Sequence, residues 1–193
     1  MEMNSTFDIV NSQLIYTYDG VEIFNKTLQN CFDGRVYLCF TRRKPKAGAD
    51  DRSGYPSTDY NFFFLLEVGR KFLEELPATI DFVKQQLTKE VKSAFEEYFT
   101  KICERLLTTD NNIEYYIGIK QSNQYGSYQI YLSRHDLDYH PFNVFDFSFT
   151  LRGAYAAKYY LPHIIIAADN LCISRNPTEP KTIPLERATT DAV

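Results

Sequence analysis

The sequence has no tryptophan, only two methionines and three histidines, and its four cysteines follow no paired spacing. Cys31, Cys39, Cys103 and Cys172 form neither a CxxC pair nor a zinc-ligand pattern. We therefore predict small buried thiols in an intracellular reducing compartment. No apolar run approaches the roughly 18 residues that cross a membrane. Residues 1–13 have neither a basic start nor an apolar segment, so no targeting segment is expected there.

Sequence motifs for catalysis are also missing. The chain has no Gly-rich phosphate loop, no nucleophile elbow and no HExxH motif. One polar loop contains side chains that bind metals elsewhere, but such residues are common in loops: His135, Asp136, Asp138 and His140. We therefore expect a protein that is not an enzyme and that uses no metal, cofactor or small-molecule substrate.

The residues that are abundant are aromatic. Fifteen Phe and fifteen Tyr accompany a hydrophobic content of 44%, and such residues favour β-strands and a packed core. The net charge is −4 and the pI is near 5.4, which argues against a nucleic-acid binder held by overall positive charge. Any nucleic-acid site must therefore depend on local charge or on base stacking.

An internal repeat organises the chain. The stretch FFFLLEVGRKFLEELPATI (62–80) returns as FSFTLRGAYAAKYYLPHII (147–165), and the offset is 85 residues (Pro77 to Pro162). Each copy passes from a dense apolar run, typical of a buried strand, into a segment with helical spacing. The repeat predicts an α+β fold with two strands-then-helix (ββββα-like) units in one chain.

Alternating apolar and polar residues predict the strands. The first unit has strands within 14–25, around an Asp-Gly turn, and within 36–43, followed by a long loop at 44–59. The second unit has strands at 113–122, 125–136 and 145–151, and then a helix at 153–171.

The first helix is expected to be long. Apolar residues recur every three to four positions from 79 to 107, and Pro77 predicts a break or kink before them. The resulting divisions are an N-terminal arm (1–13), repeat one (14–107), repeat two (112–171) and a Pro-rich, disordered tail (172–193).

Four short segments, in order, resemble a known family. They are FDGRVYLCF (32–40), FLLEVG (64–69), YGSYQIYLS (125–133) and LPHIII (161–166). They are similar to the Whirly family of single-stranded DNA-binding proteins and to the related mitochondrial guide-RNA-binding proteins of trypanosomes. The resemblance implies packing about a pseudo-twofold axis and a homo- or hetero-tetramer. It also implies single-stranded DNA or RNA as partner, and a mitochondrion, plastid or nucleus as location.

One part of the family pattern is missing. The basic Lys-Gly-Lys-Ala-Ala-Leu motif falls on DGVEI (19–23), so both lysines are lost. A structural or scaffolding protein that keeps the fold without nucleic acid therefore remains the alternative function. The alternative relative is the positive-cofactor-four type of single-stranded DNA-binding domain, which has one strands-then-helix unit per chain.

A sheet surface with interleaved aromatic and basic residues suits single strands. Unpaired bases stack on Tyr or Phe, at about 1 to 3 kcal/mol per base, while Arg and Lys contact phosphates. The candidates in the first repeat are Arg35, Tyr37, Arg42, Arg43, Lys44, Lys46, Arg52 and Tyr55. Those in the second are Lys120, Tyr125, Tyr128, Tyr131 and Arg134. The alternative is that the tyrosines belong to the core or to an interface and that the basic run is a solvated loop.

Overall fold

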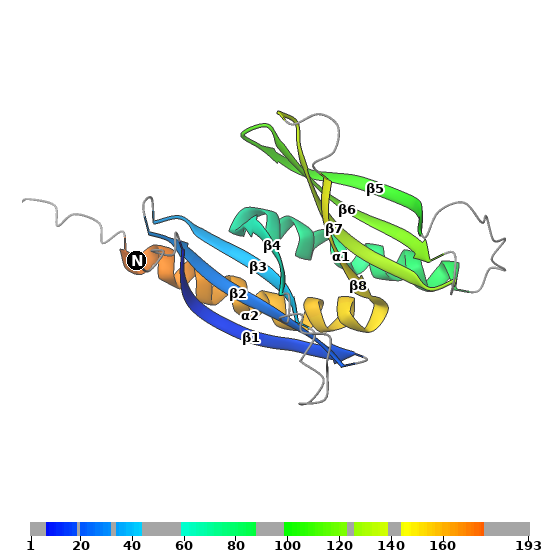
Figure 1. Ribbon diagram of the computed structural model, residues 1–193, viewed down its shortest axis with the longest axis horizontal. Helices are drawn as coiled ribbons and strands as arrows, with labels where there is room; N and C mark the ends of the chain where they lie inside the picture. The colour runs from blue at the N-terminus through cyan, green and yellow to red at the C-terminus, as the bar shows by residue number, and fades with distance from the viewer. Residues whose placement is uncertain are drawn as a thin grey trace, which may run out of the picture.

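A computed structural model describes residues 7–18, 20–31, 34–43, 59–87, 99–122, 126–138 and 144–175. It contains two four-stranded antiparallel sheets, each followed by a helix, so the α+β layout with two ββββα units is confirmed. Figure 1 shows α2 lying along the first sheet and α1 passing close to the second sheet.

The first sheet has its strands in chain order. The elements of this unit are β1 (Phe7–Tyr18), β2 (Val21–Asn30), β3 (Val36–Arg43), β4 (Tyr60–Leu65) and α1 (Leu66–Gln86). β1 and β2 form the hairpin expected around residues 19 and 20, where Gly20 takes a positive φ of 69°. β4 passes directly into α1, because Leu65 is extended and the next residue is helical.

The second sheet repeats this order. Its unit contains β5 (Phe99–Asp110), β6 (Ile113–Ser122), β7 (Tyr128–Asp136), β8 (Val144–Thr150) and α2 (Leu151–Arg175). The 85-residue offset holds at the strand-to-helix junction, since α1 begins at Leu66 and α2 at Leu151.

The repeat extends further than the sequence comparison indicated. β1, β2 and β3 begin 92 residues before β5, β6 and β7 (7 to 99, 21 to 113, 36 to 128). β1 has register shifts after Ile9 and Leu14, and β5 has them after Lys101 and Leu106, at the same offset. The loop before β4 is longer than the loop before β8, and this difference changes the offset from 92 to 85.

Both units also use the same turn between their second and third strands. The Gln29 side-chain amide donates to the carbonyl oxygen of Gly34 at 2.9 Å, and Gln121 donates to that of Gly126 at 3.1 Å. Both glycines have positive φ, 71° and 64°, a backbone conformation that costs a larger residue free energy. The two units therefore share elements, bulges and turn chemistry.

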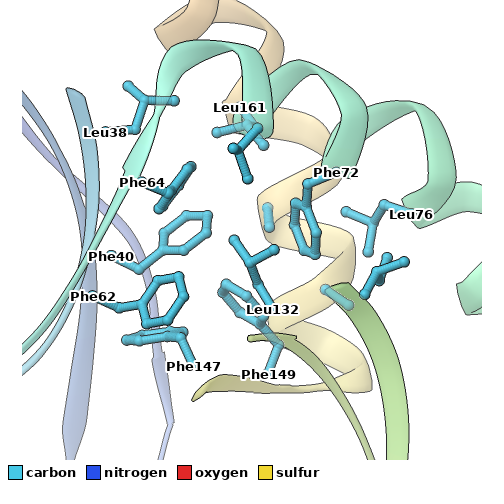
Figure 2. Close-up of a cluster of buried hydrophobic side chains, with 14 of the residues drawn as sticks. Leu38, Phe40, Phe62, Phe64, Phe72, Leu76, Leu132, Phe147, Phe149 and Leu161 are labelled. Atoms are coloured by element: carbon cyan, nitrogen blue, oxygen red, sulfur yellow. The ribbon is translucent and has the colours of Figure 1, made fainter. Parts of the chain in front are cut away.

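Phenylalanine dominates the core between the sheets and helices. Figure 2 shows rings from β3, β4, α1 and β8 meeting in one cluster. Phe40 is central, with its ring centroid 4.9 Å from that of Phe64, 5.3 Å from Phe147 and 4.9 Å from Phe149. We call the face of each sheet that carries these rings its inner face, and the opposite face its outer face.

The long helix expected at 79–107 is wrong. α1 ends at Gln86, and residues 99–107 belong to β5, the first strand of the second sheet. Phe99, Ile102 and Leu106 produced the helical spacing, but all three are exposed. The two bulges in β5 interrupt strand alternation, so the apolar positions there imitate a helical period.

Other boundaries also differ. Residues 7–13, expected in an arm, belong to β1, and residues 172–175, expected in the tail, extend α2. α1 continues through Pro77 without the break that we predicted as one outcome. All four cysteines are free as expected, but only Cys39 is buried. Residues 44–58 of the loop predicted at 44–59, and the predicted tail from residue 176 onward, lie outside the described residues.

Candidate nucleic-acid interface

A cleft of about 460 Å³ opens between the two sheets, and we call it the inter-sheet cleft. The first sheet contributes the ends of β1 and β2 and one residue of β3, while the second sheet contributes all four strands. Its lining consists of Tyr16, Tyr18, Val21, Ile23, Arg42, Phe99, Lys120, Gln129, Asp146, Ser148 and Thr150. Aromatic rings, two cations and several uncharged polar groups therefore face one volume.

On the second sheet, Lys120 organises the outer face. Its Nζ donates to Asp146 Oδ2 at 2.6 Å and lies 4.9 Å from the centre of the Phe99 ring. It also lies 5.5 Å from the ring of Tyr131, so two aromatic rings and one carboxylate hold the ammonium in place. The Lys120 side chain is only 15% exposed, whereas Phe99 is 39% exposed and presents its ring to the cleft.

On the first sheet, the end of the β1–β2 hairpin forms the opposite wall. Tyr16 packs on Gly153 of α2 so closely that a Cβ at residue 153 would lie 2.3 Å from the ring. Tyr18, two residues later, is 54% exposed. Tyr16 thus joins the hairpin to the start of α2, while Tyr18 is accessible within the cleft.

Side chains of the first sheet also bind the edge of β8. Arg42 donates from an NH2 group to the carbonyl oxygen of Ser148 at 3.1 Å, and the Tyr60 hydroxyl donates to that of Asp146 at 2.8 Å. Burial and the Asp146 charge raise the pKa of Tyr60, which keeps this donor protonated. These bonds satisfy backbone acceptors of an edge strand and fix the second sheet against the first.

The structure brings together two of the predicted cations and separates others. Arg42 and Lys120 both line the inter-sheet cleft. Arg43 and Tyr37 lie on the outer face of the first sheet, because neighbouring residues of a strand point to opposite sides. Arg43 forms a two-bond ion pair with Asp59, at 3.2 and 3.1 Å, and Tyr37 packs edge-on against Phe7.

Tyr131 is a correction to the predicted stacking residues. It is 3% exposed, and its ring covers Gly118 so closely that a Cβ there would lie 2.3 Å away. Its hydroxyl donates to Glu104 Oε1 at 2.9 Å, and burial followed by the Glu104 interaction raises its pKa. A ring held in this way packs the sheet surface and is not available to a base.

Tyr128 and Arg134 also take structural positions. Tyr128 is partly buried and packs against the hydrophobic core. Arg134 pairs with the buried Tyr115 and the exposed Phe145 across the sheet. It is therefore on the inner face, and it lies 3.9 Å from Asp136. Neither side chain lines the inter-sheet cleft. The alternative given for the tyrosines, a place in the core, therefore applies to Tyr128.

Glu104 connects a polar network on the outer face of the second sheet. It accepts hydrogen bonds from Lys101 at 2.8 Å and Ser133 at 3.3 Å, besides that from Tyr131. Burial raises the pKa of Glu104, but the hydrogen bonds from Lys101 and Tyr131 lower it by more than burial raises it. The net pKa is below the usual glutamate value, so the carboxyl stays ionised at lower pH than an ordinary glutamate does. His135 Nε2 is 3.8 Å from Glu104 and 3.3 Å from the Ser133 hydroxyl.

Several predicted residues cannot be placed in the interface. Arg35 is exposed just before β3. The others lie outside the described residues: Lys44, Lys46, Arg52, Tyr55 and Tyr125. Within the described part of the chain, no group of three His, Cys, Asp or Glu side chains could hold a metal ion, and no helix has the length and hydropathy of a membrane span.

The sequence prediction missed the exposed aromatic rings of the cleft. Tyr18 was assigned only to a hairpin strand, and Phe99 was assigned to a helix that does not exist. The signal for Tyr18 was its position beside the Asp-Gly turn, where a terminal strand residue projects past the sheet. No local signal could pair Tyr18 with Phe99, because they belong to different sheets.

Comparison with known proteins adds no relative to this description. No protein-family model matches the chain, and a search of curated proteins finds no match. The resemblance to the Whirly family therefore stays a prediction from the short segments quoted above.

Proposed function

We propose that this protein binds single-stranded nucleic acid without catalysing a reaction. The observation that carries the proposal is the inter-sheet cleft, where the exposed rings of Tyr18 and Phe99 accompany Arg42 and Lys120. Unpaired bases offer flat faces to such rings, and their phosphates attract such cations. In a duplex the same base faces are stacked within the helix, so single strands are the preferred ligand.

The repeated unit supports a Whirly-like arrangement as part of the proposal. Equivalent strands, bulges and turns follow one another at fixed offsets, as an internal repeat requires. We propose that the two copies pack about a pseudo-twofold axis, as the resemblance implies. The resemblance also implies a homo- or hetero-tetramer, and the mass of the native particle in solution tests that assembly. DNA and RNA are both retained as ligands, because stacking on an aromatic ring does not depend on the sugar.

A specific observation favours the alternative of a scaffolding protein. Lys120 is paired with Asp146, Arg43 is paired with Asp59, and Arg42 donates to a backbone carbonyl. Cations that serve the fold in this way are partly neutralised before any phosphate arrives. Under this alternative the charged pairs fix the two sheets together, and nucleic acid does not bind.

Filter binding separates the two functions. Dissociation constants would be measured for single-stranded DNA, single-stranded RNA and duplex DNA of one sequence at two salt concentrations. The double variant Arg42→Gln with Lys120→Gln should weaken single-strand binding and reduce the slope of log K against log salt by about 1.4, since each phosphate contact contributes about 0.7.

The matched control is Lys84→Gln with Arg105→Gln. Lys84 and Arg105 are exposed cations paired with Asp81 and Glu75, and they lie outside the inter-sheet cleft. The control pair changes net charge by the same amount, so its salt slope should remain that of the original protein. Absence of a preference for single strands, or equal losses in both double variants, would refute the proposed function.

A further inference from the structure

The inter-sheet cleft has the size of a site for one small molecule. Its volume of about 460 Å³ falls within the range of about 300 to 1,000 Å³ that is typical of ligand pockets. The rings of Tyr18 and Phe99 line it from different sheets, and the ammonium of Lys120 lies 4.9 Å from the Phe99 ring centre. A ligand with an aromatic group and an attached anion could therefore contact the Phe99 ring and the Lys120 ammonium at the same time.

The cleft also contains uncharged groups that can select a ligand. The Ser148 hydroxyl oxygen is buried and has no hydrogen-bond partner among the described residues. The Gln129 side chain lies on the neighbouring strand and lines the same volume. A buried hydroxyl without a partner is unfavourable, so a ligand that bonds to it recovers free energy.

The equivalent position in the other half of the molecule carries packed aromatic rings and no cation. The 92-residue and 85-residue offsets make Phe7, Leu28, Tyr37 and Phe63 the counterparts of Phe99, Lys120, Gln129 and Ser148. The ring of Phe7 packs edge-on against Tyr37 at 5.4 Å and stacks with Phe63 at 6.0 Å. Leu28 is buried where the second sheet has its lysine. The counterpart is therefore an apolar cluster without the cation.

We propose that the inter-sheet cleft binds one nucleotide of a single strand, with the base between Tyr18 and Phe99 and the phosphate at Lys120 and Arg42. Because the counterpart has Leu28 in place of the cation and its Phe7 ring packs against Tyr37 and Phe63, each chain has one such site and not two. The inference rests on the proposed function and adds the ligand unit and its stoichiometry. The cleft thus anchors one position of the strand, while neighbouring nucleotides cross the sheet surface.

Isothermal titration calorimetry with a thymidine trinucleotide tests the site. We expect one trinucleotide per chain. Tyr18→Leu and Phe99→Leu should each weaken binding by about 5- to 150-fold, the range for loss of one stacked base. Both side chains are exposed, and they lie on different sheets, so a folding defect in one variant leaves the other as a test. The matched control, Phe63→Leu, alters the counterpart cluster and should leave affinity unchanged.

A second trinucleotide with an abasic central residue completes the test. The abasic trinucleotide should bind the original protein as weakly as the intact trinucleotide binds the Phe99→Leu variant. Phe99→Leu should cause no further loss of affinity for the abasic trinucleotide. Two sites per chain, a loss with Phe63→Leu equal to that with Phe99→Leu, or no trinucleotide binding would overturn the inference.

Binding of a long single strand, measured in parallel, distinguishes failure of the nucleotide site from failure of the proposed function. Retained binding of that strand by the Tyr18→Leu and Phe99→Leu variants without any loss would refute the nucleotide site alone. Failure of the long strand to bind the original protein would refute both the site and the function.

Discussion

At the scale of single residues, the two repeats differ most where polar side chains replace apolar ones. Asn25 and Thr27 on β2 correspond to Ile117 and Ile119 on β6, at the 92-residue offset. All four side chains are buried on inner faces, but the polar atoms of Asn25 and Thr27 have no hydrogen-bond partner among the described residues. Repeat one therefore has polar groups in its core that reduce its stability.

Thr27→Val should raise the free energy of unfolding by about 1 kcal/mol, because the change removes a buried hydroxyl without a partner. The matched control is Thr41→Val, in which the lost hydroxyl donates to Asn61 at 2.8 Å. That variant should be less stable by about 1 kcal/mol. Urea unfolding measures both changes, and a destabilised Thr27→Val variant would contradict the assignment.

Glu104→Gln should change the dependence of stability on pH. The pKa of Glu104 is lowered in the folded protein, so its stabilisation is present above the ordinary glutamate pKa of about 4.3. That stabilisation is lost as the pH falls through the lower, folded value. The variant should therefore be less stable at pH 7, and its deficit should shrink below about pH 4.3. Thermal unfolding across this range measures the deficit, and a constant deficit would contradict the prediction.

At the scale of secondary-structure elements, bulges and turns decide what each segment becomes. The β5–β6 hairpin turns at Asn111 and Asn112, which both have positive φ, 45° and 61°. This is the conformation that tight hairpin turns require, and asparagine accepts it more readily than other residues with a Cβ. A helix was expected up to residue 107, but the two asparagines that follow instead reverse the chain between two strands.

Asn111→Ala should lower the free energy of unfolding by about 1 kcal/mol, because alanine resists the left-handed conformation. Asn111→Gly is the control, since glycine adopts positive φ without that cost. The glycine variant should equal or exceed the original protein in a denaturant midpoint. Equal losses in both variants would show that the asparagine side chain, and not its backbone angle, matters at this turn.

At the scale of the whole molecule, the two similar halves produce unlike surfaces. The outer face of the first sheet carries the cluster of Phe7, Tyr37 and Phe63, while the outer face of the second carries the polar network around Glu104 and Lys120. The inter-sheet cleft lies between the second of these surfaces and the β1–β2 hairpin. The two similar halves thus present one cleft with polar groups and a cation, and one apolar aromatic cluster.

The sequence alone determined the repeated ββββα layout, because buried strands and strand-to-helix junctions leave local patterns that recur at a fixed offset. The aromatic content and the Asp-Gly turn were sufficient for β2 to β4 and for the end of β1, but residues 7–13 of β1 were missed. The same local reasoning failed at β5, where bulges displace apolar residues from alternation. Local reasoning also chose Tyr131 as a stacking residue because it is aromatic, but its ring is buried over Gly118.

Only the tertiary structure decided which side chains share the inter-sheet cleft. Tyr18, Arg42, Phe99 and Lys120 come from four strands in two sheets, and the packing of those sheets sets their separation. Local patterns record which face of a strand is buried, but they do not record which strand lies opposite. The sequence therefore predicted that the site contains aromatic and basic residues, and the packing of the two sheets determines which of these residues line the cleft.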